Sequence, residues 1–455
     1  MDYYEILLAK KLNGGGGGGE ATLIDKNISS NGTYNASSDN ADGYKKVVVS
    51  VPNTYSAGDE GKVVSSGALV SQSSTTYTSN NTYDTTLINS VTVNVSGGGG
   101  GTVSKPFKNV NFYDYDGTIV YSYDSNEWSS MSDLPSNPTH QGLTGKGWNY
   151  TKAEIDAELL AQPNVPVNVG AEYQTEDGKT RFYCTFNDGR LSPSVFCGVN
   201  GTVEIDWGDG SQTDTLTGTN VNTYKNVSHT YASQGDYVIS LNVTGSAKIS
   251  DPIRKGTSNF NAYRAFKKVE FGKNIVTGDD CFRDNGNLEC VAWSEENLDS
   301  GYRTFYGCVS LKYITMLRKY DSISSYFLVN AQSLKAVSIP PTKQTLNSFC
   351  IGTTWLTRLS LPSSVTTIGS SGLRGIGALS LLTIPASVTS IGSQAFYGNS
   401  SVGEYHFLGS TPPSIESSTF QDIPSDCVIY VPTASVDTYK SASNWSSYAS
   451  YIQGE

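Results

Sequence analysis

Asp114 and Asp116 follow the apolar run NVNFY and precede Gly117. At this spacing one carboxylate could attack phosphorus and the other could act as acid and base, with Mg²⁺ between them. Such chemistry also needs a parallel sheet with helices, a downstream lysine and a further acidic pair. The surrounding block, residues 102–162, offers only one predicted helix. The run TIVYSY after Asp-Gly instead predicts a β-hairpin.

Other polar groups give weak signals for metal binding or catalysis. Asp206 and Asp209 in DWGDGS lack the spacing of an EF-hand, so we expect a turn in which they accept hydrogen bonds from nearby N–H groups. His140, His229 and His406 fall in three predicted domains, and no GxSxG motif occurs. Scattered acidic residues leave a carboxylate-pair glycosidase open, although no block resembles a scaffold with a deep cleft. We therefore expect no catalytic residue, no metal and no cofactor.

Aromatic side chains are the remaining candidates for ligand contact. Flat rings beside Asn and Asp suit sugar faces or a protein hot spot, although core packing is the alternative for each ring. The candidate binding residues are Tyr302, Tyr306, Tyr313, Tyr320, Tyr326 and Trp355.

Composition excludes two classes of partner. The net charge is −11 and no basic block occurs, which disfavours nucleic acid. No apolar run approaches the roughly 18 residues of a membrane span, and MDYYEILLAKKL does not resemble a signal peptide. We expect no membrane insertion. The seven cysteines form no CxxC pair and predict buried thiols, although Cys184 and Cys197 flank a predicted hairpin and could pair.

A repeat organises the C-terminal part of the chain. Its spacings of 22 or 23 residues predict a solenoid, because a single repeat cannot bury its own apolar face. The anchor residues are Phe266, Leu288, Leu311, Leu334, Leu356, Leu379 and Val402. A bulky apolar residue precedes most anchors: Phe260, Phe282, Phe305, Phe327, Phe349, Leu373 and Phe396.

Strand-like runs follow the anchors and predict a core residue by residue. The third and fifth residues after each anchor should point inward. They are Val269/Phe271, Val291/Trp293, Ile314/Met316, Val337/Ile339, Leu359/Leu361, Leu382/Ile384 and Tyr405/Phe407. The intervening residues should face solvent: Glu270, Ala292, Thr315, Ser338, Ser360, Thr383 and His406.

The rest of the chain is predicted to be mostly β. Glycine runs at 14–19 and 97–101 read as linkers on either side of two related small β units in 20–96. Tyr34 matches Tyr77, and packing between the copies or between chains would stabilise units too short to fold alone. The block 102–162 should be a hairpin plus a helix with a Thr151/Glu154 capping box. Residues 163–250 should form a small sandwich and 251–455 the solenoid with its cap.

Two stretches resemble known domain families. The ladder with LTIPASVTSIGSQAFYGNSSV is similar to BspA-type leucine-rich repeats over about 260–455, and the ending CVIYVPTASVDTYKSASNWSSYASYI resembles their terminal cap. The early turns depart from this pattern because they lack the Ile-Pro or Leu-Pro pair. VEIDWGDGS and SHTYASQGDYVISL resemble a PKD-type immunoglobulin-like sandwich, whose Asp206–Gly210 and His229–Tyr231 mostly shape the fold.

The N-terminal half resembles tail-fibre proteins from phages and prophages of Gram-positive gut bacteria. ISSNGTYNASSDNADGYKKVVVSVPN, VNFYDYDGTIVYSY and NPTHQGLTGKGWNYT carry this resemblance. It implies a virion protein, assembled in the host cytoplasm, that docks to a tail or baseplate protein through residues 1–13 and acts as a homotrimer. The solenoid, 251–455, would recognise a cell-surface polysaccharide or protein. The alternatives are a bacterial surface adhesin and, third, a glycan-degrading depolymerase.

Overall fold

The computed structural model describes residues 23–28, 32–39, 43–50, 64–65, 71–73, 76–80, 90–93, 108–187, 191–255, 266–298, 301–319 and 326–455. The chain divides into two compact units, Met1–Lys108 and Asn109–Glu455, and each is treated by itself. Strands dominate both units, as the sequence predicts. Among the described residues, no helix has the length and apolar character needed to cross a membrane.

The first unit contains two small sheets in which the related segments pair with each other. Tyr34 lies opposite Val91, and Tyr77 lies opposite Val49. Strands of the first segment therefore pair with strands of the second in both sheets. This pairing is packing between the copies, one of the two kinds of packing that their short length predicts. The strands are β1 (Leu23–Ile28), β2 (Gly32–Asn35), β3 (Gly43–Ser50), β4 (Val64–Ser65), β5 (Ser71–Ser73), β6 (Thr76–Asn80) and β7 (Ser90–Val93), with the 3-10 helix η1 (Ala36–Asp39) after β2. The predicted attachment segment 1–13 and both glycine runs lie outside the described residues.

The second unit opens with a four-stranded sheet in the order β10-β11-β8-β9. The hairpin expected at Asp-Gly is confirmed, since β8 and β9 are antiparallel. The predicted helix is confirmed as α3, with Thr151 and Glu154 forming the capping box. The elements are β8 (Val110–Tyr113), β9 (Ile119–Tyr123), α2 (Ser125–Ser129), β10 (Leu143–Trp148), α3 (Lys152–Ala161) and β11 (Val167–Thr175).

Strand β11 shifts the domain boundary that the sequence places at residue 163. It runs parallel to β8 and antiparallel to β10, so it belongs to this earlier sheet. A parallel neighbour requires a crossover connection, and α3 lies within it. Val167, Val169, Ala171 and Tyr173 pack into a core with Phe112, Trp148 and Ile155. We call residues 109–175 the covering module.

The next strands do not form a separate sandwich. Their order is β14-β13-β15-β12-β16-β18, with β17 beside β15, so the sheet continues into the first solenoid turns. Arg181 of β12 pairs with Glu270 of β16. This continuity differs from the independent immunoglobulin-like sandwich expected over 163–250. The bounds are β12 (Thr180–Phe186), β13 (Pro193–Asp206), β14 (Asp214–Ser228), β15 (Gly235–Lys255), β16 (Phe266–Glu270), β17 (Ile275–Thr277) and β18 (Cys290–Ala292).

Short parallel strands stack from turn to turn through the rest of the solenoid. A cap follows, in which β28 pairs with β27 and Trp445 is buried. The strands are β19 (Tyr313–Thr315), β20 (Ala336–Ser338), β21 (Thr345–Leu346), β22 (Thr367–Ile368), β23 (Leu381–Ile384), β24 (Ser390–Ile391), β25 (Glu404–Phe407), β26 (Ser414–Ile415), β27 (Val428–Val431) and β28 (Ile452–Gly454). The helices are η3 (Glu295–Asn297), η5 (Thr433–Ser435), α4 (Val436–Ser441) and η6 (Trp445–Tyr448).

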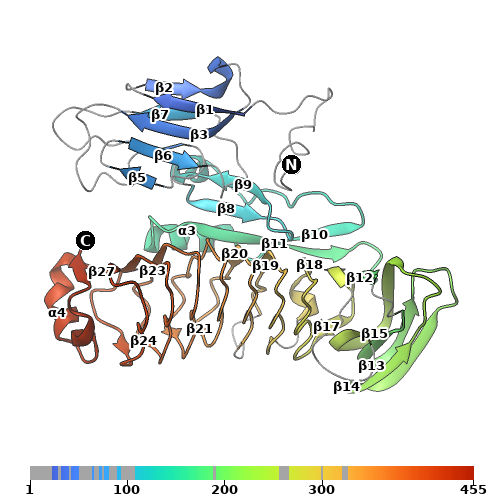
Figure 1. The fold of residues 1–455 in the computed structure, drawn as a ribbon. Coiled ribbons are helices and arrows are strands. Elements are labelled where there is room, and N and C mark those ends of the chain that lie inside the picture. Colours follow the sequence, from blue (N-terminus) through green and yellow to red (C-terminus); the bar gives the residue numbers. More distant parts are fainter. Residues whose placement is uncertain are drawn as a thin grey trace. The chain divides into compact units, whose positions relative to one another are not determined.

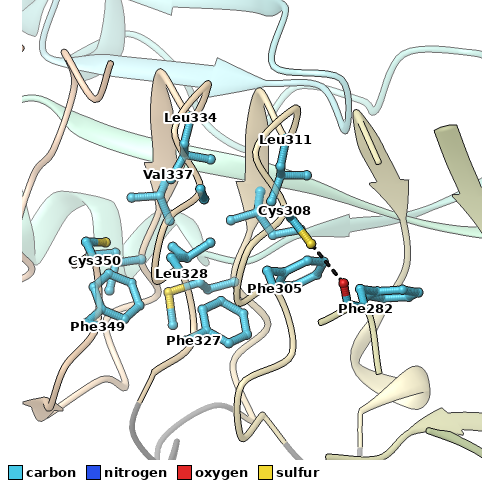
Figure 2. Packing of buried hydrophobic residues seen from close by; sticks show 14 of the residues in the cluster. Phe282, Phe305, Cys308, Leu311, Phe327, Leu328, Leu334, Val337, Phe349 and Cys350 are labelled. Carbon is cyan, nitrogen blue, oxygen red and sulfur yellow. Dashed lines mark hydrogen bonds between the residues drawn. The ribbon is translucent and has the colours of Figure 1, made fainter. Parts of the chain in front are cut away.

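The predicted solenoid core is confirmed almost completely. All seven anchors are buried, and of the fourteen inward positions only Leu359 is half-buried. Figure 2 shows the phenylalanines before the anchors lying side by side from turn to turn. The Phe282 and Phe305 rings are stacked, with their centroids 5.3 Å apart. Cys308 donates its thiol to the carbonyl of Phe282 across turns. Phe260 lies outside the described residues.

The turns with anchors from Leu288 to Val402 each bend at two left-handed positions, one on either side of the buried phenylalanine or leucine. These positions lie eight and four residues before the anchor. The first set is Asp280, Arg303, Tyr326, Ser348, Ser371 and Gln394, all with φ between 43° and 74°. The second set is Asp284, Gly307, Asn330, Gly352, Gly375 and Gly398. Because these bends recur at the same positions, they form a regular edge along the solenoid. Side chains at corresponding positions of successive turns therefore lie next to one another.

Candidate ligand-binding surface

The outer face of the solenoid strands is covered over its first turns. Sequence alternation predicts that Glu270, Ala292, Thr315 and Ser338 face solvent, but all four are buried, with at most 6% exposed. This expectation is wrong because β11 lies across β16, β18, β19 and β20 (Figure 1). The residues at the same position of the later turns, Ser360, Thr383 and His406, are half-buried.

The side of β11 that faces the solenoid is polar, and its groups are matched to solenoid groups. Asn168 donates to Ser360 Oγ at 3.3 Å, and Glu172 accepts from the Glu295 N–H at 3.1 Å. Gly170 has no room for a side chain, because an added Cβ would lie 2.3 Å from Thr315 Oγ1. Glycine at this point therefore sets how closely β11 approaches the strands.

Residues just before and within α3 bind the covering module to the solenoid turns that follow the anchors Leu311 and Leu334. Asn149, fully buried, donates to the carbonyl of Met316 and to Ser338 Oγ, each at 2.9 Å. Glu154 forms a bidentate ion pair with Arg318 at 2.5 and 2.7 Å. This pair lowers the pKa of Glu154, since hydrogen bonding and charge outweigh partial burial. These hydrogen bonds and the ion pair make the covering module an integral part of the second unit.

Tyr313 belongs to this interface, so its assignment to a binding surface is corrected. It is 1% exposed, and its ring stacks on Tyr113 at 5.0 Å and 12°. The outer side of strand β19 would have displayed Tyr313 if β11 and the β8–β9 hairpin did not cover it. Burial raises the pKa of the Tyr313 hydroxyl. Tyr313 therefore joins the covering module to the solenoid.

An uncovered part of the strand face remains in the later turns. His406 lies between two carboxylates, with Nδ1 2.7 Å from Glu455 and Nε2 3.1 Å from Glu404. Its ring stacks on Tyr430 at 4.8 Å. Leu381, 41% exposed, lies on the neighbouring strand β23. These contacts fix the His406 ring. The uncovered surface therefore combines polar groups with the exposed apolar side chain of Leu381.

The edge at the first left-handed position brings tyrosine and aspartate side chains together, as the sequence predicts, and adds arginine, which the sequence analysis does not predict. Tyr302 and Tyr326 meet edge to face at 6.4 Å between centroids. Arg303 lies over the Tyr302 ring at 4.5 Å and forms an ion pair with Asp280 at 2.8 Å. Tyr326 is 39% exposed.

A second ring–guanidinium contact extends this edge. Arg283 lies 5.3 Å from the Tyr306 ring centroid and forms ion pairs with Asp280 at 3.6 Å and Asp284 at 3.3 Å. Backbone hydrogen bonds between turns hold these residues, as in the donation from the Asp284 N–H to the Tyr306 carbonyl at 2.6 Å. We call the set Asp280, Arg283, Asp284, Tyr302, Arg303, Tyr306 and Tyr326 the edge patch.

The structure thus unites three of the six predicted binding residues: Tyr302, Tyr306 and Tyr326. Trp355 is 61% exposed on a later turn, and no ring contact joins it to the edge patch among the described residues. Tyr320 lies outside the described residues. Sequence reasoning missed Arg283 and Arg303, although an alignment of turns by anchor places Asp280, Arg303 and Tyr326 at one position.

The acidic motifs have structural roles, as the turn interpretation predicts. Asp206 and Asp209 accept hydrogen bonds from the backbone N–H groups of Gly208 and Ser211. Asp209 also contacts His229 at 2.7 Å. Hydrogen bonds from the Ser211 side chain and backbone, together with His229, lower the pKa of Asp209 to about 2. Asp114 closes the β8–β9 turn and lies 2.7 Å from His140. Within the described ranges, no group of three or more His, Cys, Asp or Glu side chains could hold a metal ion.

Comparison with known proteins supports the nature of the repeats. The model of the BspA-type leucine-rich repeat region matches residues 256–376 and 323–445, in 6 copies. A crystal structure of a leucine-rich repeat protein from Bacteroides ovatus ATCC 8483 is similar at 19% identity with a TM-score of 0.26. The match covers 36% of this chain and 52% of that protein, about half its length. No curated protein matches the chain. Residues 256–445 therefore form a region of BspA-type leucine-rich repeats.

Proposed function

We propose that the chain is an adhesin-like binding protein that recognises a cell-surface glycan or protein through the edge patch of its solenoid. One observation carries the proposal: Tyr302, Arg303 and Tyr326 lie at adjacent positions on a regular edge, while β11 occupies the neighbouring strand face. Tyrosine and arginine are the residue types enriched at binding hot spots.

The rigid repeat supports this role. Among the described residues, backbone hydrogen bonds join neighbouring turns along the solenoid, so the edge patch needs little ordering when a ligand arrives. The patch is also polar enough to remain exposed without a permanent partner, because its guanidinium and carboxylate groups pair with one another. The proposal assigns the chain no catalytic role.

A phage tail fibre is the second candidate for the setting in which this binding occurs. It is favoured by the resemblance of NVNFYDYDGTIVYSYD and the other N-terminal pieces to tail-appendage proteins. Residues 1–13 would then dock to a tail or baseplate protein, and three copies would raise weak affinity through effective concentration. Tail genes in the neighbouring reading frames and a trimer by light scattering would support it; a monomer would remove the avidity argument.

Binding of the labelled full-length protein to intact bacterial cells tests the proposed function. Across a panel of Gram-positive and Gram-negative cells, the unchanged protein should bind at least one strain. The double variant Tyr302→Ala/Tyr326→Ala should lose at least tenfold in affinity there. Leu160→Ala is the control, since Leu160 is 86% exposed on α3 and is not part of the edge patch. Equal binding by the double variant would refute the assignment. Release of reducing sugars would instead promote the depolymerase.

A further inference from the structure

We infer that the edge patch recognises a neutral, hydroxyl-rich sugar ring and discriminates against polyanions. This inference rests on the proposed function and narrows its ligand class. It depends on three separate properties of the patch: the balance of its charges, the presentation of its rings, and the backbone conformation of Arg303 and Tyr326.

The charges of the patch cancel. Two guanidinium groups, Arg283 and Arg303, face two carboxylates, Asp280 and Asp284, at 2.8 to 3.6 Å. A phosphate or sulfate approaching the arginines would therefore have to displace a carboxylate that is already in place. The chain carries a net charge of −11, so it exerts no long-range attraction on a polyanion.

The same groups suit hydroxyls. Paired carboxylates and guanidiniums present acceptors and donors side by side in fixed positions, which match the mixed donor and acceptor character of sugar hydroxyls. Arg303 covers one face of Tyr302, whereas Tyr326 meets Tyr302 only by its edge and remains 39% exposed. The exposed Tyr326 ring is the surface on which the apolar face of a sugar would stack.

Arg303 and Tyr326 are bulky side chains at a left-handed bend that successive turns share. Their φ values are 49° and 74°, in the left-handed region that disfavours side chains with a Cβ. Glycine or asparagine would relieve this strain. The corresponding residues of later turns, Ser348 and Ser371, show that a small side chain completes the same bend. Strain held by a bulky, half-exposed residue at such a position is typical of a functional site.

A stability–binding comparison tests this reading of the strain. Tyr326→Gly should keep or raise the urea midpoint of the full chain and weaken cell binding at least tenfold. Ser371→Gly is the matched control: it relieves the same bend on a later turn and should leave binding unchanged. A lowered midpoint for Tyr326→Gly would mean that the tyrosine supports the fold, and would overturn the strain argument.

Ligand chemistry is tested on cells that bind the unchanged protein. Periodate, which cleaves the vicinal diols of sugars, should abolish binding, and protease treatment should not. Raising NaCl from about 50 to 500 mM should change the affinity less than twofold, because no counterions are released. Soluble mannan, galactan or dextran should compete, and heparin should not.

The outcomes separate the two proposals. If patch variants bind cells as well as the unchanged protein, the proposed function fails. If they lose binding but the ligand proves sensitive to protease, resistant to periodate, or displaced by heparin or salt, the patch is a binding site and the neutral-sugar inference is overturned.

Discussion

Tyr113 and Tyr313 stack face to face, with ring centroids 5.0 Å apart and an interplanar angle of 12°. One ring comes from the β8–β9 hairpin and the other from a strand of the solenoid, and both are 1% exposed. The two regions are thus joined by a buried aromatic contact as well as by polar bonds. Several measurable consequences arise from this interface.

Tyr313→Ala should destabilise the full chain by about 3–5 kcal/mol, because it removes a buried aromatic ring and leaves a cavity. Urea unfolding followed by fluorescence measures the loss. A double-mutant cycle with Tyr113→Ala should give a coupling of about 1 kcal/mol. Trp355→Ala, at a position 61% exposed, should change stability by less than about 0.5 kcal/mol. Additive single effects would show that the stacked rings do not stabilise one another.

Gly170→Ala should cost about 1–3 kcal/mol, because its Cβ would lie 2.3 Å from Thr315 Oγ1 and 2.6 Å from the Tyr313 hydroxyl. Combining it with Thr315→Ala should recover part of this loss, since the nearer obstruction is removed. Gly403→Ala is the control, with the nearest atom 3.9 Å from an added Cβ. If Gly170→Ala proved as harmless as Gly403→Ala, β11 would not lie as close to β19 as described.

Glu172 should make stability fall as pH rises. Burial raises its pKa from 4.5 to about 7, despite the hydrogen bond from the Glu295 N–H and the nearby charges of Arg318 and Lys319. The folded protein therefore binds this proton more tightly than the unfolded chain between these pH values. Stability from this group is fully present below about pH 4.5 and is lost as pH rises through about 7, by up to about 3 kcal/mol.

Glu172→Gln removes this pH dependence and keeps an acceptor for the Glu295 N–H. The variant should be more stable than the unchanged protein at pH 8 and nearly equal to it at pH 4.5. Urea midpoints at both pH values measure the difference. A variant that is less stable at pH 8 would show that the Glu172 carboxylate is ionised and well paired in the folded state.

The cysteines should react slowly with thiol reagents in the native protein. Cys184 and Cys197 are both present as buried thiols that are not bonded to each other, and burial raises the pKa of Cys197 to about 12. Cys290, although only partly buried, has its pKa raised to about 12 for the same reason. A colorimetric thiol assay should detect all seven thiols only after denaturation. Five thiols under denaturing conditions would indicate a disulfide.

Sequence periodicity predicted the solenoid well because its core depends on local spacing. A strand places alternate residues on opposite sides, so the register of Val337 and Ile339 follows directly from the anchor Leu334. The hairpin at Asp114 and the cap at Thr151 were equally predictable, because their signals are local.

The cover over the strand face was not predictable in the same way. Asn168, Glu172 and Gln174 give β11 the alternation of a strand with one exposed face, yet all three are at most 5% exposed. Their polar groups are satisfied by solenoid groups distant in sequence, such as Glu296, which accepts from Gln174 at 2.9 Å. The small residues Ala292 and Ser338 on the solenoid strands were the sequence signal that another strand could pack closely against them. Gly170 of β11 was the matching signal on the opposite side of the contact.

The limited reach of β11 has a consequence for how this chain can vary. Its contacts end near Ser360, whereas each later turn touches mainly its two neighbours. A whole repeat inserted after Ser363 would lengthen the solenoid and leave the bonds from Asn168 to Ser360 and from Ser363 to Glu158 in register. The same insertion before Ser338 would move Arg318 away from Glu154 or Ser338 away from Asn149. The molecule can therefore grow or shrink at its C-terminal end, while its early turns are confined to a fixed number.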